Sequence, residues 1–251
     1  MNREATDLAG VRHISFETLG STNAEALARA RVGERGPLWI TAASQSGGRG
    51  RRGNNWVSPP GNFYGTLLLG EPSAPALAPQ LSFVAGLAVH DAVAACAPQL
   101  VPELGLKWPN DLLLAKRKVA GLLIEAESRP AFAVAIGIGV NCISHPSQTT
   151  FPATDLQAEG ANVDPQPLFE ALAQAMERRL ELWRAGAGFP AIRADWLGRA
   201  AGLGETIQVR LPEREFVGRF HGIDEAGHLL IAQAEKPIET IAAGDVFGIG
   251  P

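Results

Sequence analysis

SQSGGRGRRGNNW, residues 44–56, is a glycine-rich loop that carries three arginines, Arg49, Arg51 and Arg52, and no acidic residue. Glycine lets backbone N–H groups approach an anion closely, and the guanidinium group offers paired donors to a phosphate or carboxylate. A predicted strand leads into the loop, and Trp56 follows it as an apolar anchor. The loop therefore lies within a folded domain, where it is either a solvated connection or an anion-binding loop that orders around a ligand.

A third interpretation, an arginine–glycine tract that binds RNA, fits the sequence less well. Such tracts repeat within disordered, low-complexity regions, whereas this stretch occurs once. The whole chain of 251 residues carries a net charge of -4, with 46% hydrophobic and 19% charged residues. That composition is ordinary for a globular protein, and it does not favour a protein that coats nucleic acid.

The composition also predicts a cytoplasmic protein with no disulfide and no membrane span. Cys96 and Cys142 are the two cysteines, and each lies in an apolar run typical of a buried, reduced thiol. Residues 1–10 lack the apolar core of a signal peptide. The longest apolar stretch, 81–97, is interrupted by polar residues and is therefore not expected to cross a membrane.

The spacing of apolar residues and turn formers predicts an α+β fold with a mixed sheet. The predicted helices are 22–32, 77–97, 165–187 and 190–200, and the predicted strands are 38–43, 63–69, 106–114, 119–126 and 131–142. After residue 201, four short segments at close spacing predict the strands of a small β-barrel. We therefore divide the chain into a main domain, 1–200, and a C-terminal domain, 201–251.

Two further stretches place small polar residues or glycines at the ends or inside of predicted elements. ETLGSTNAEA contains Ser21, Thr22 and Asn23 before a helix, whose first N–H groups are free to bind an anion. Thr22 and Glu25 fit a capping box, which accounts for Thr22 but not for all three polar residues. GIGVN, 137–141, puts glycines inside an apolar strand, which indicates close approach of backbone or ligand.

The predicted hairpin over 106–126 carries an acid and a base. KWPND contains Pro109, which interrupts a strand, and a capped turn or a functional site would both have this pattern. KVAGLLIEAE begins at Lys118, only a few positions out of register from Asp111, so both side chains could face one cleft. The chain has no G-x-x-x-x-G-K-[ST] loop and no complete G-x-G-x-x-G, so arginines and glycines would have to hold any nucleotide.

In this order and spacing, the five stretches resemble the catalytic domain of the biotin protein ligases. The matching segments are STN at 21–23, SQSGGRGRRGNNW at 44–56, KWPNDLLL at 107–114, KVAGLLIE at 118–125 and GIGVN at 137–141. The resemblance is firm over 12–142 and looser beyond, where the family has a small SH3-like barrel. Because few residues precede Ser21, the chain resembles the short class of the family, which lacks the DNA-binding domain of the ligase-repressors.

The resemblance implies a two-step reaction that uses ATP and Mg²⁺. The carboxylate of biotin attacks the α-phosphate of ATP to give biotinyl-5′-adenylate, and a lysine of a biotin carboxyl carrier domain then attacks the adenylate. The resemblance implies biotin binding by Ser21, Thr22, Asn23, Gln45, Arg49, Gly50, Arg51 and Lys118, nucleotide binding by Arg52, Trp56, Asn110 and Asn141, and catalysis by Lys118, Arg51 and Asp111. Asp111 would orient or deprotonate the acceptor lysine.

The resemblance leaves alternatives open. Lipoate ligases share the fold and the reaction type, and a non-enzymatic RNA-binding module is the alternative from a different class. We expect no specific DNA affinity, and a homodimer is compatible with the resemblance. Some relatives place an arginine near the C-terminus against the nucleotide, and this chain departs from that pattern because its last arginine is Arg219.

The opening loop also carries a prediction about dynamics. We expect 46–53 to be mobile without ligand, because glycines are costly to order and three unpaired arginines repel one another. An anionic adenylate would remove that repulsion and order the loop.

Overall fold

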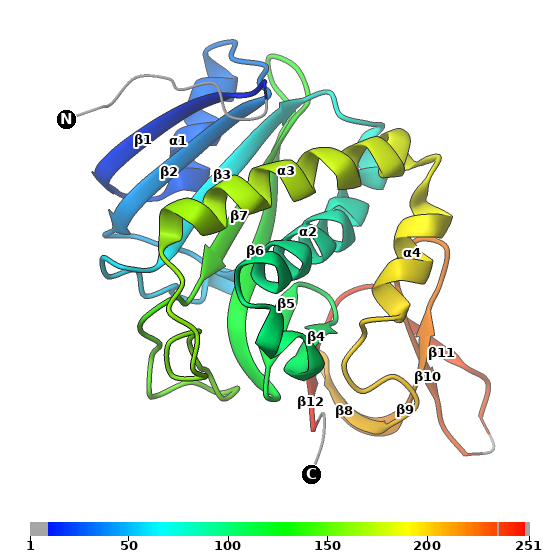
Figure 1. Ribbon diagram of the computed structural model, residues 1–251. Helices are drawn as coiled ribbons and strands as arrows, with labels where there is room; N and C mark the ends of the chain where they lie inside the picture. Colours follow the sequence, from blue (N-terminus) through cyan, green and yellow to red (C-terminus); the bar gives the residue numbers. More distant parts are fainter. Residues whose placement is uncertain (1–9, 235, 249–251) are drawn as a thin grey trace.

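The computed structural model describes residues 10–234 and 236–248 and contains two sheets (Figure 1). The larger sheet has seven strands in the order β1-β2-β3-β7-β6-β5-β4, with β1 parallel to β2 and the other neighbours antiparallel. Its strands are β1 (Arg12–Leu19), β2 (Leu38–Gln45), β3 (Phe63–Gly70), β4 (Leu104–Lys107), β5 (Asp111–Leu114), β6 (Arg117–Glu127) and β7 (Ala133–Val140). The predicted α+β class with a mixed sheet is confirmed.

Helices cover both faces of this sheet (Figure 1). Within the described residues they are α1 (Thr22–Arg31), α2 (Leu81–Cys96), α3 (Pro165–Trp183) and α4 (Phe189–Leu197), with short 3-10 turns η1 (Arg51–Gly53), η2 (Pro75–Gln80), η3 (Pro98–Glu103) and η4 (Arg184–Gly186). Helix α1 packs on one face, whereas α2 and α3 pack on the other. On that second face, Phe169 of α3 stacks on Phe63 and meets Trp39 edge to face.

The sequence of β7 separates the two faces of the sheet. Val134 and Ile136 join the core beneath α2 and α3, whereas Ala135 lies beneath α1. Because side chains alternate along a strand, Gly137 and Gly139 also lie on the α1 face. Helix α1 covers only part of that face; Gly137 lies where α1 begins, and Gly139 lies against Trp56. The sheet is therefore left without bulky side chains at the point where the polar start of α1 meets it.

The predicted strand 106–114 consists of two strands joined by a turn. Strand β4 ends at Lys107 and β5 begins at Asp111, and the two residues are register partners in an antiparallel pair. Pro109, which follows a cis peptide bond from Trp108, lies in the turn, where its missing N–H leaves no gap in the ladder. The sequence pattern does not reveal the turn, because the short strands on both sides of it are rich in leucine.

Several other predicted elements differ in extent, and α3 ends at Trp183 rather than at 187 and α4 at Leu197 rather than at 200. The sequence pattern does not predict β1, an edge strand whose side chains are only partly buried. Residues 75–80 form a 3-10 turn that contains Pro79, so helix α2 begins at Leu81 rather than at 77. The N-cap of α1 is Ser21, whose Oγ accepts from the backbone N–H of Ala24 at 3.4 Å, and the predicted cap at Thr22 is wrong.

The C-terminal domain is a five-stranded antiparallel sheet in the order β11-β10-β9-β8-β12. Its strands are β8 (Thr206–Arg210), β9 (Glu215–Ile223), β10 (Leu229–Ala232), β11 (Glu239–Ile241) and β12 (Asp245–Phe247). The last of the four predicted segments thus divides into two strands. The predicted boundary at 200/201 falls between α4 and β8, and residues 1–9 and 249–251 of the two predicted domains lie outside the described residues.

The apolar segment before the first cysteine belongs to the core. Pro75–Cys96 is long and apolar enough to cross a membrane, but most of it is buried inside the protein. Both cysteines are free thiols. Cys142 is buried, and burial raises its pKa to about 12. The prediction of a buried thiol is wrong for Cys96, which is half-buried at the last residue of α2.

Candidate active site

A cavity of about 470 Å³ opens on the α1 face of the large sheet. Strands β6 and β7 form its floor, the start of α1 forms one end, and the glycine–arginine loop, the 107–111 turn and a loop at 146–153 form its walls. The lining includes every predicted site residue except Arg52: Ser21, Thr22, Asn23, Gln45, Arg49, Gly50, Arg51, Trp56, Asn110, Asp111, Lys118 and Asn141. The structure therefore brings together residues from five separate parts of the chain.

The α1 end of the cavity is a buried network of polar side chains. Thr22 donates its backbone N–H to Oε1 of Gln45 at 2.8 Å, and its hydroxyl lies 3.2 Å from the same oxygen. Asn23 donates to Oε2 of Glu125 at 2.9 Å and accepts from the Thr66 hydroxyl at 2.7 Å. Because these side chains hold one another, the polar groups facing the cavity are fixed before any ligand arrives.

Glycines in the floor allow side chains to lie directly against the sheet. A Cβ on Gly137 would lie 2.2 Å from Oδ1 of Asn23, and a Cβ on Gly139 would lie 2.5 Å from Nε1 of Trp56. The Trp56 indole also packs on Gly121, the register partner of Gly139. Only glycine leaves room for these contacts, which explains the GIGVN pattern.

Lys118 reaches the cavity because the register between β5 and β6 shifts. Asp111 pairs with Gly121, but one residue is passed over before Leu113 pairs with Lys118. Without the shift, Lys118 would lie opposite Leu114 and point to the other face of the sheet. The shift puts the lysine on the face of Asp111, so the two residues share one cleft, as the hairpin predicts.

The resulting cluster is a carboxylate between two ammonium groups. Nζ of Lys118 lies 2.6 Å from Oδ1 of Asp111, and Nζ of Lys107 lies 3.2 Å from Oδ2. Burial by itself would raise the pKa of Asp111, but the two ammonium groups outweigh it and hold the pKa below its ordinary value. A carboxylate with a low pKa is a weak proton acceptor, so this geometry favours a role in orienting the lysines over one in deprotonating a substrate.

This cluster predicts a pH-dependent contribution to stability. We expect Asp111→Asn to lower the free energy of unfolding at pH 7 by about 3 kcal/mol, because both lysines lose their counter-ion. The pKa of Asp111 is lowered by folding, so its contribution is complete above the ordinary value of 3.8 and is lost as the pH falls through the folded value. Urea unfolding should therefore separate wild type from variant at pH 7, and the curves should converge only below pH 3.8. A difference that does not change with pH would contradict this role for Asp111.

The arginines of the glycine–arginine loop pair with acids from distant parts of the chain. Arg49 donates to both oxygens of Glu125 at 3.1 and 3.0 Å. Arg52, which does not line the cavity, lies 2.6 Å from Asp245, and Arg51 lies 3.8 Å from the same carboxylate. The assumption that these arginines are unpaired is therefore wrong. Burial lowers the pKa of Arg51, yet its guanidinium stays charged at neutral pH.

The C-terminal sheet closes one end of the cavity. Arg51 donates to Oδ1 of Asn110 at 3.3 Å and to the carbonyl oxygen of Gly244 at 3.4 Å, so it joins the loop, the 107–111 turn and the C-terminal sheet. Arg210 and Phe247 line the cavity, and the guanidinium of Arg210 lies 4.5 Å from the Phe247 ring centroid. The C-terminal sheet thus contributes a cation to the cavity even though it has no arginine after Arg219.

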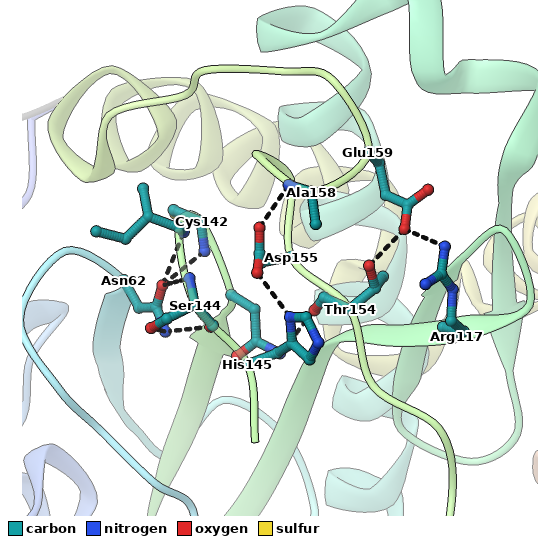
Figure 2. A network of polar contacts seen from close by, with 11 residues as sticks. Asn62, Arg117, Cys142, Ser144, His145, Thr154, Asp155, Ala158 and Glu159 are labelled. Atoms are coloured by element: carbon teal, nitrogen blue, oxygen red, sulfur yellow. Dashed lines mark hydrogen bonds and ion pairs between the residues drawn. The ribbon is translucent and has the colours of Figure 1, made fainter. Parts of the chain in front are cut away.

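A polar network holds the loop after β7 (Figure 2). Oδ1 of Asn62 accepts the backbone N–H groups of Cys142, Ile143 and Ser144 at 2.9, 3.0 and 3.3 Å. Asn141 donates its side-chain amide to the carbonyl oxygen of Thr154 at 2.9 Å. Asn141, which was predicted to face a nucleotide, lines the cavity, but its side-chain amide N–H points to the loop.

The carboxylates at the cavity are all paired with cations. Asp111, Glu125 and Asp245 contact lysines or arginines. In the part of the chain that the structure describes, no group of three or more His, Cys, Asp or Glu side chains is placed to hold a metal ion. Mg²⁺ commonly binds through substrate phosphates and waters with one or two carboxylates. This donor set fits a Mg²⁺ carried on nucleotide phosphates better than a resident metal.

Several residues of the site have no role predicted from the sequence. Lys107 belongs to the KWPND stretch. A turn predicted at Pro109 would have placed Lys107 opposite Asp111. Thr66 lies within an apolar strand, and Arg210 lies in the C-terminal sheet. The loop at 146–153 has the polar, proline-containing composition of any surface loop and carries no local signal.

Comparisons with known proteins agree with this geometry. Residues 20–141 match the Biotin/lipoate A/B protein ligase family, and residues 202–247 match the Biotin protein ligase C terminal domain. A biotin–[acetyl-CoA-carboxylase] ligase of Paracoccus denitrificans is 45% identical over 239 residues, which cover 90% of this chain and 96% of that protein.

Solved structures of biotin protein ligases share the fold over most of this chain. A biotin protein ligase from Aquifex aeolicus in complex with biotin and ATP superimposes with a TM-score of 0.78 at 26% identity, covering 94% of this chain and 97% of that one. A biotin protein ligase from Leishmania major in complex with biotinyl-5-AMP gives 0.65 at 26% identity, covering 91% and 98%. With the sequence, the cavity and both domains in agreement, this chain belongs to the biotin protein ligase family of enzymes.

Proposed function

We propose that this chain activates biotin with ATP and transfers it to a lysine of a biotin carboxyl carrier domain. The observation that carries the proposal is the position of Lys118 and Arg51, which line one cavity together with the polar start of α1. Both substrates of the first step are anions, so a site that brings them together needs fixed cations. The relatives named above support biotin and ATP as those substrates.

The cavity runs along β7 and has two chemically different ends. Gly137 lies beside Asn23 at one end, Gly139 lies beneath Trp56, and Asn141 meets the loop after β7 at the other end. We assign the Asn23 end to biotin and the Asn141 end to the nucleotide. The biotin carboxylate and the α-phosphate would then meet beside Lys118, which lies 5.2 Å from the Trp56 ring centroid.

In the first step, a carboxylate oxygen of biotin bonds to the α-phosphorus and pyrophosphate leaves. Negative charge grows on the phosphoryl oxygens as the bond forms. Lys118 and Arg51 are already fixed by Asp111 and Asn110, so they stabilise this charge without reorganising. Each well-placed donor of this kind contributes about 3 kcal/mol to transition-state stabilisation.

In the second step, the neutral amine of the carrier lysine attacks the carbonyl carbon of the adenylate, AMP leaves, and the nitrogen releases one proton to solvent. Asp111 is committed to Lys118 and Lys107, and its lowered pKa makes it a poor base. We therefore propose that Asp111 orients Lys118 in both steps. When Mg²⁺ is bound with ATP, it neutralises part of the phosphate charge.

One assay tests the first step. We expect ATP–pyrophosphate exchange that depends on biotin and Mg²⁺, and mass spectrometry should find one biotin on the lysine of a carboxylase carrier domain. Lipoate in place of biotin is the matched control. Exchange supported by lipoate alone would establish a lipoate-type ligase, whereas salt-dependent RNA affinity without any exchange would establish a binding module.

A second prediction concerns the glycine–arginine loop. We expect trypsin to cut after Arg49 and Arg52 in the free protein and to cut more slowly there with saturating biotin and ATP. The exposed ion pairs that hold these arginines contribute about 1 kcal/mol or less, whereas an adenylate would close the loop over the cavity. Fragments identified by mass spectrometry report each cleavage separately.

The control for that experiment is cleavage at the exposed residues Lys116, in the β5–β6 turn, and Arg117, the first residue of β6. Bound ligand at about 100 times its dissociation constant raises global stability by about 2.7 kcal/mol and could slow all cleavage. Protection confined to the loop supports ordering around the ligand. Equal protection at the turn, or no protection at the loop, would show that the loop is only a solvated connection.

We also propose a cytoplasmic location, no specific affinity for DNA, and a homodimer as the state to test. Two free thiols support a reducing compartment, and the net charge of -4 argues against a DNA-binding surface. Salt-resistant binding to an operator-like duplex would contradict the second point. Sedimentation with and without biotin and ATP tests the third.

A further inference from the structure

The loop after β7 is closed at its neck by a contact between His145 and Asp155 (Figure 2). Nδ1 of His145 lies 2.6 Å from Oδ2 of Asp155, and Oδ1 of Asp155 accepts the backbone N–H of Ala158 at 2.7 Å. Asp155 is 4% exposed, so both of its oxygens are used inside the protein. Figure 2 shows the two side chains pointing toward one another across the loop. This contact ties together two points ten residues apart in the sequence.

The segment between these two points forms one wall of the cavity. Its lining residues are Pro146, Gln148, Thr149, Thr150, Phe151 and Ala153. The ring of Phe151 lies over Lys107, with 4.3 Å from Nζ to the ring centroid. The segment therefore covers the cluster of two lysines and a carboxylate at the end of the cavity away from α1.

The same segment fixes the backbone of Lys118. The N–H of Lys118 donates to the carbonyl oxygen of Pro152 at 2.8 Å, and the N–H of Thr154 donates to the carbonyl oxygen of Lys118 at 2.9 Å. Lys118 also lies next to the register shift between β5 and β6, where the regular ladder is interrupted. The backbone position of Lys118 therefore depends on the loop, and the loop depends on the closure of its neck.

We propose that Asp155 is a positioning residue for adenylate formation. By holding His145, it keeps 146–153 against the cavity and fixes the backbone of Lys118. The inference rests on the proposed function in one respect, because it assigns this wall to the nucleotide. The start of α1 is held by a separate network, which runs through Gln45, Thr66 and Glu125. Loss of Asp155 should therefore impair the use of ATP and spare the binding of biotin.

The test compares Asp155→Ala with Asp224→Ala in pyrophosphate exchange. Asp224 has the same chemistry outside the cavity: its Oδ1 accepts from the N–H of Ala226 at 2.9 Å, and its Oδ2 lies 3.0 Å from Nδ1 of His228. We expect Asp155→Ala to raise the KM for ATP about tenfold and to leave the KM for biotin within about twofold. Asp224→Ala should change neither KM, whatever it does to the melting temperature.

Two further variants keep the test decisive. Asp155→Asn retains an acceptor for Ala158 and can donate its amide N–H to Nδ1 of His145, so it keeps the neck closed and should leave the KM for ATP close to the wild-type value even if Asp155→Ala folds poorly. His145→Ala removes the other half of the neck and should raise the KM for ATP in the same direction. A KM for ATP within twofold of wild type in Asp155→Ala, or an equal rise in both KM values, would overturn the proposal.

Hydrogen exchange supplies a readout that does not need activity. In Asp155→Ala, the amides of Lys118 and Thr154 should exchange faster, whereas those of the β6–β7 ladder should remain protected. Unchanged protection of Lys118 and Thr154 would overturn the link between the neck and the lysine. If wild type performs no exchange of pyrophosphate, the proposed function fails, and faster amide exchange in the variant still establishes the link.

Discussion

Replacing Lys118 by alanine is expected to lower biotin-dependent pyrophosphate exchange by a factor of about 100 to 1000. The ammonium group lines the cavity, 2.6 Å from Asp111, and is fixed before substrates bind. Removing one preorganised hydrogen-bond donor that stabilises the charge developing in a transition state typically has an effect of this size. The fall should appear in kcat, because the lysine is held to act on the transition state.

The control for this substitution is Lys116→Ala in the same hairpin. Lys116 is exposed in the turn, so its removal should change stability by less than about 0.5 kcal/mol and leave exchange unchanged. In Lys118→Ala, Asp111 keeps Lys107 as a partner, so the fold should persist, and circular dichroism and thermal unfolding can verify it. Exchange within about threefold of wild type would show that Lys118 serves only the electrostatics of Asp111.

Gly137→Ala is expected to raise the KM for biotin about tenfold or more. The new Cβ would lie 2.2 Å from Oδ1 of Asn23, a distance that no real contact tolerates. Asn23 cannot simply rotate away, because it bonds to Thr66, to Glu125 and to the carbonyl oxygen of Leu123. The first turn of α1 must therefore move, and displacement of a substrate-binding group by about 1 Å can reduce activity up to 100-fold.

Gly86→Ala is the matched control for Gly137→Ala. Gly86 lies in α2 on the other face of the sheet, and a Cβ there would meet its nearest neighbour, Leu106, at an ordinary 3.5 Å. Alanine should stabilise a helix interior by about 0.5–1 kcal/mol relative to glycine, so this variant should bind biotin normally. Biotin titrations monitored by calorimetry separate the two variants. A wild-type KM for biotin in Gly137→Ala would show that the Asn23 end of the cavity does not hold this substrate.

Local sequence patterns determined the elements and much of the site. Glycines inside an apolar strand predicted close contact, and Gly137 and Gly139 do meet Asn23 and Trp56. Ser21, Thr22 and Asn23 were predicted as site residues because capping of the helix does not need all three of them. Periodicity and turn formers act over a few residues, so a single sequence contains them.

The partners of the charged residues came only from the tertiary structure. Arg52 pairs with Asp245, 193 residues away in the sequence, and Arg49 pairs with Glu125, 76 residues away. No local pattern encodes such pairs, because they form only when the C-terminal sheet and β6 pack against the loop. This is why the sequence alone suggested a loop of unpaired arginines.

The orientation of Lys118 shows the same division between sequence and tertiary structure. The sequence placed a lysine and an aspartate on one hairpin, but which face the lysine occupies depends on a one-residue shift in register. That shift is stabilised by Pro152 and Thr154, which bond to the Lys118 backbone from a loop with no recognisable signal. The sequence by itself thus determined which residues carry the chemistry. Long-range packing decided which way they point, because side-chain direction in a strand follows the register of its neighbours.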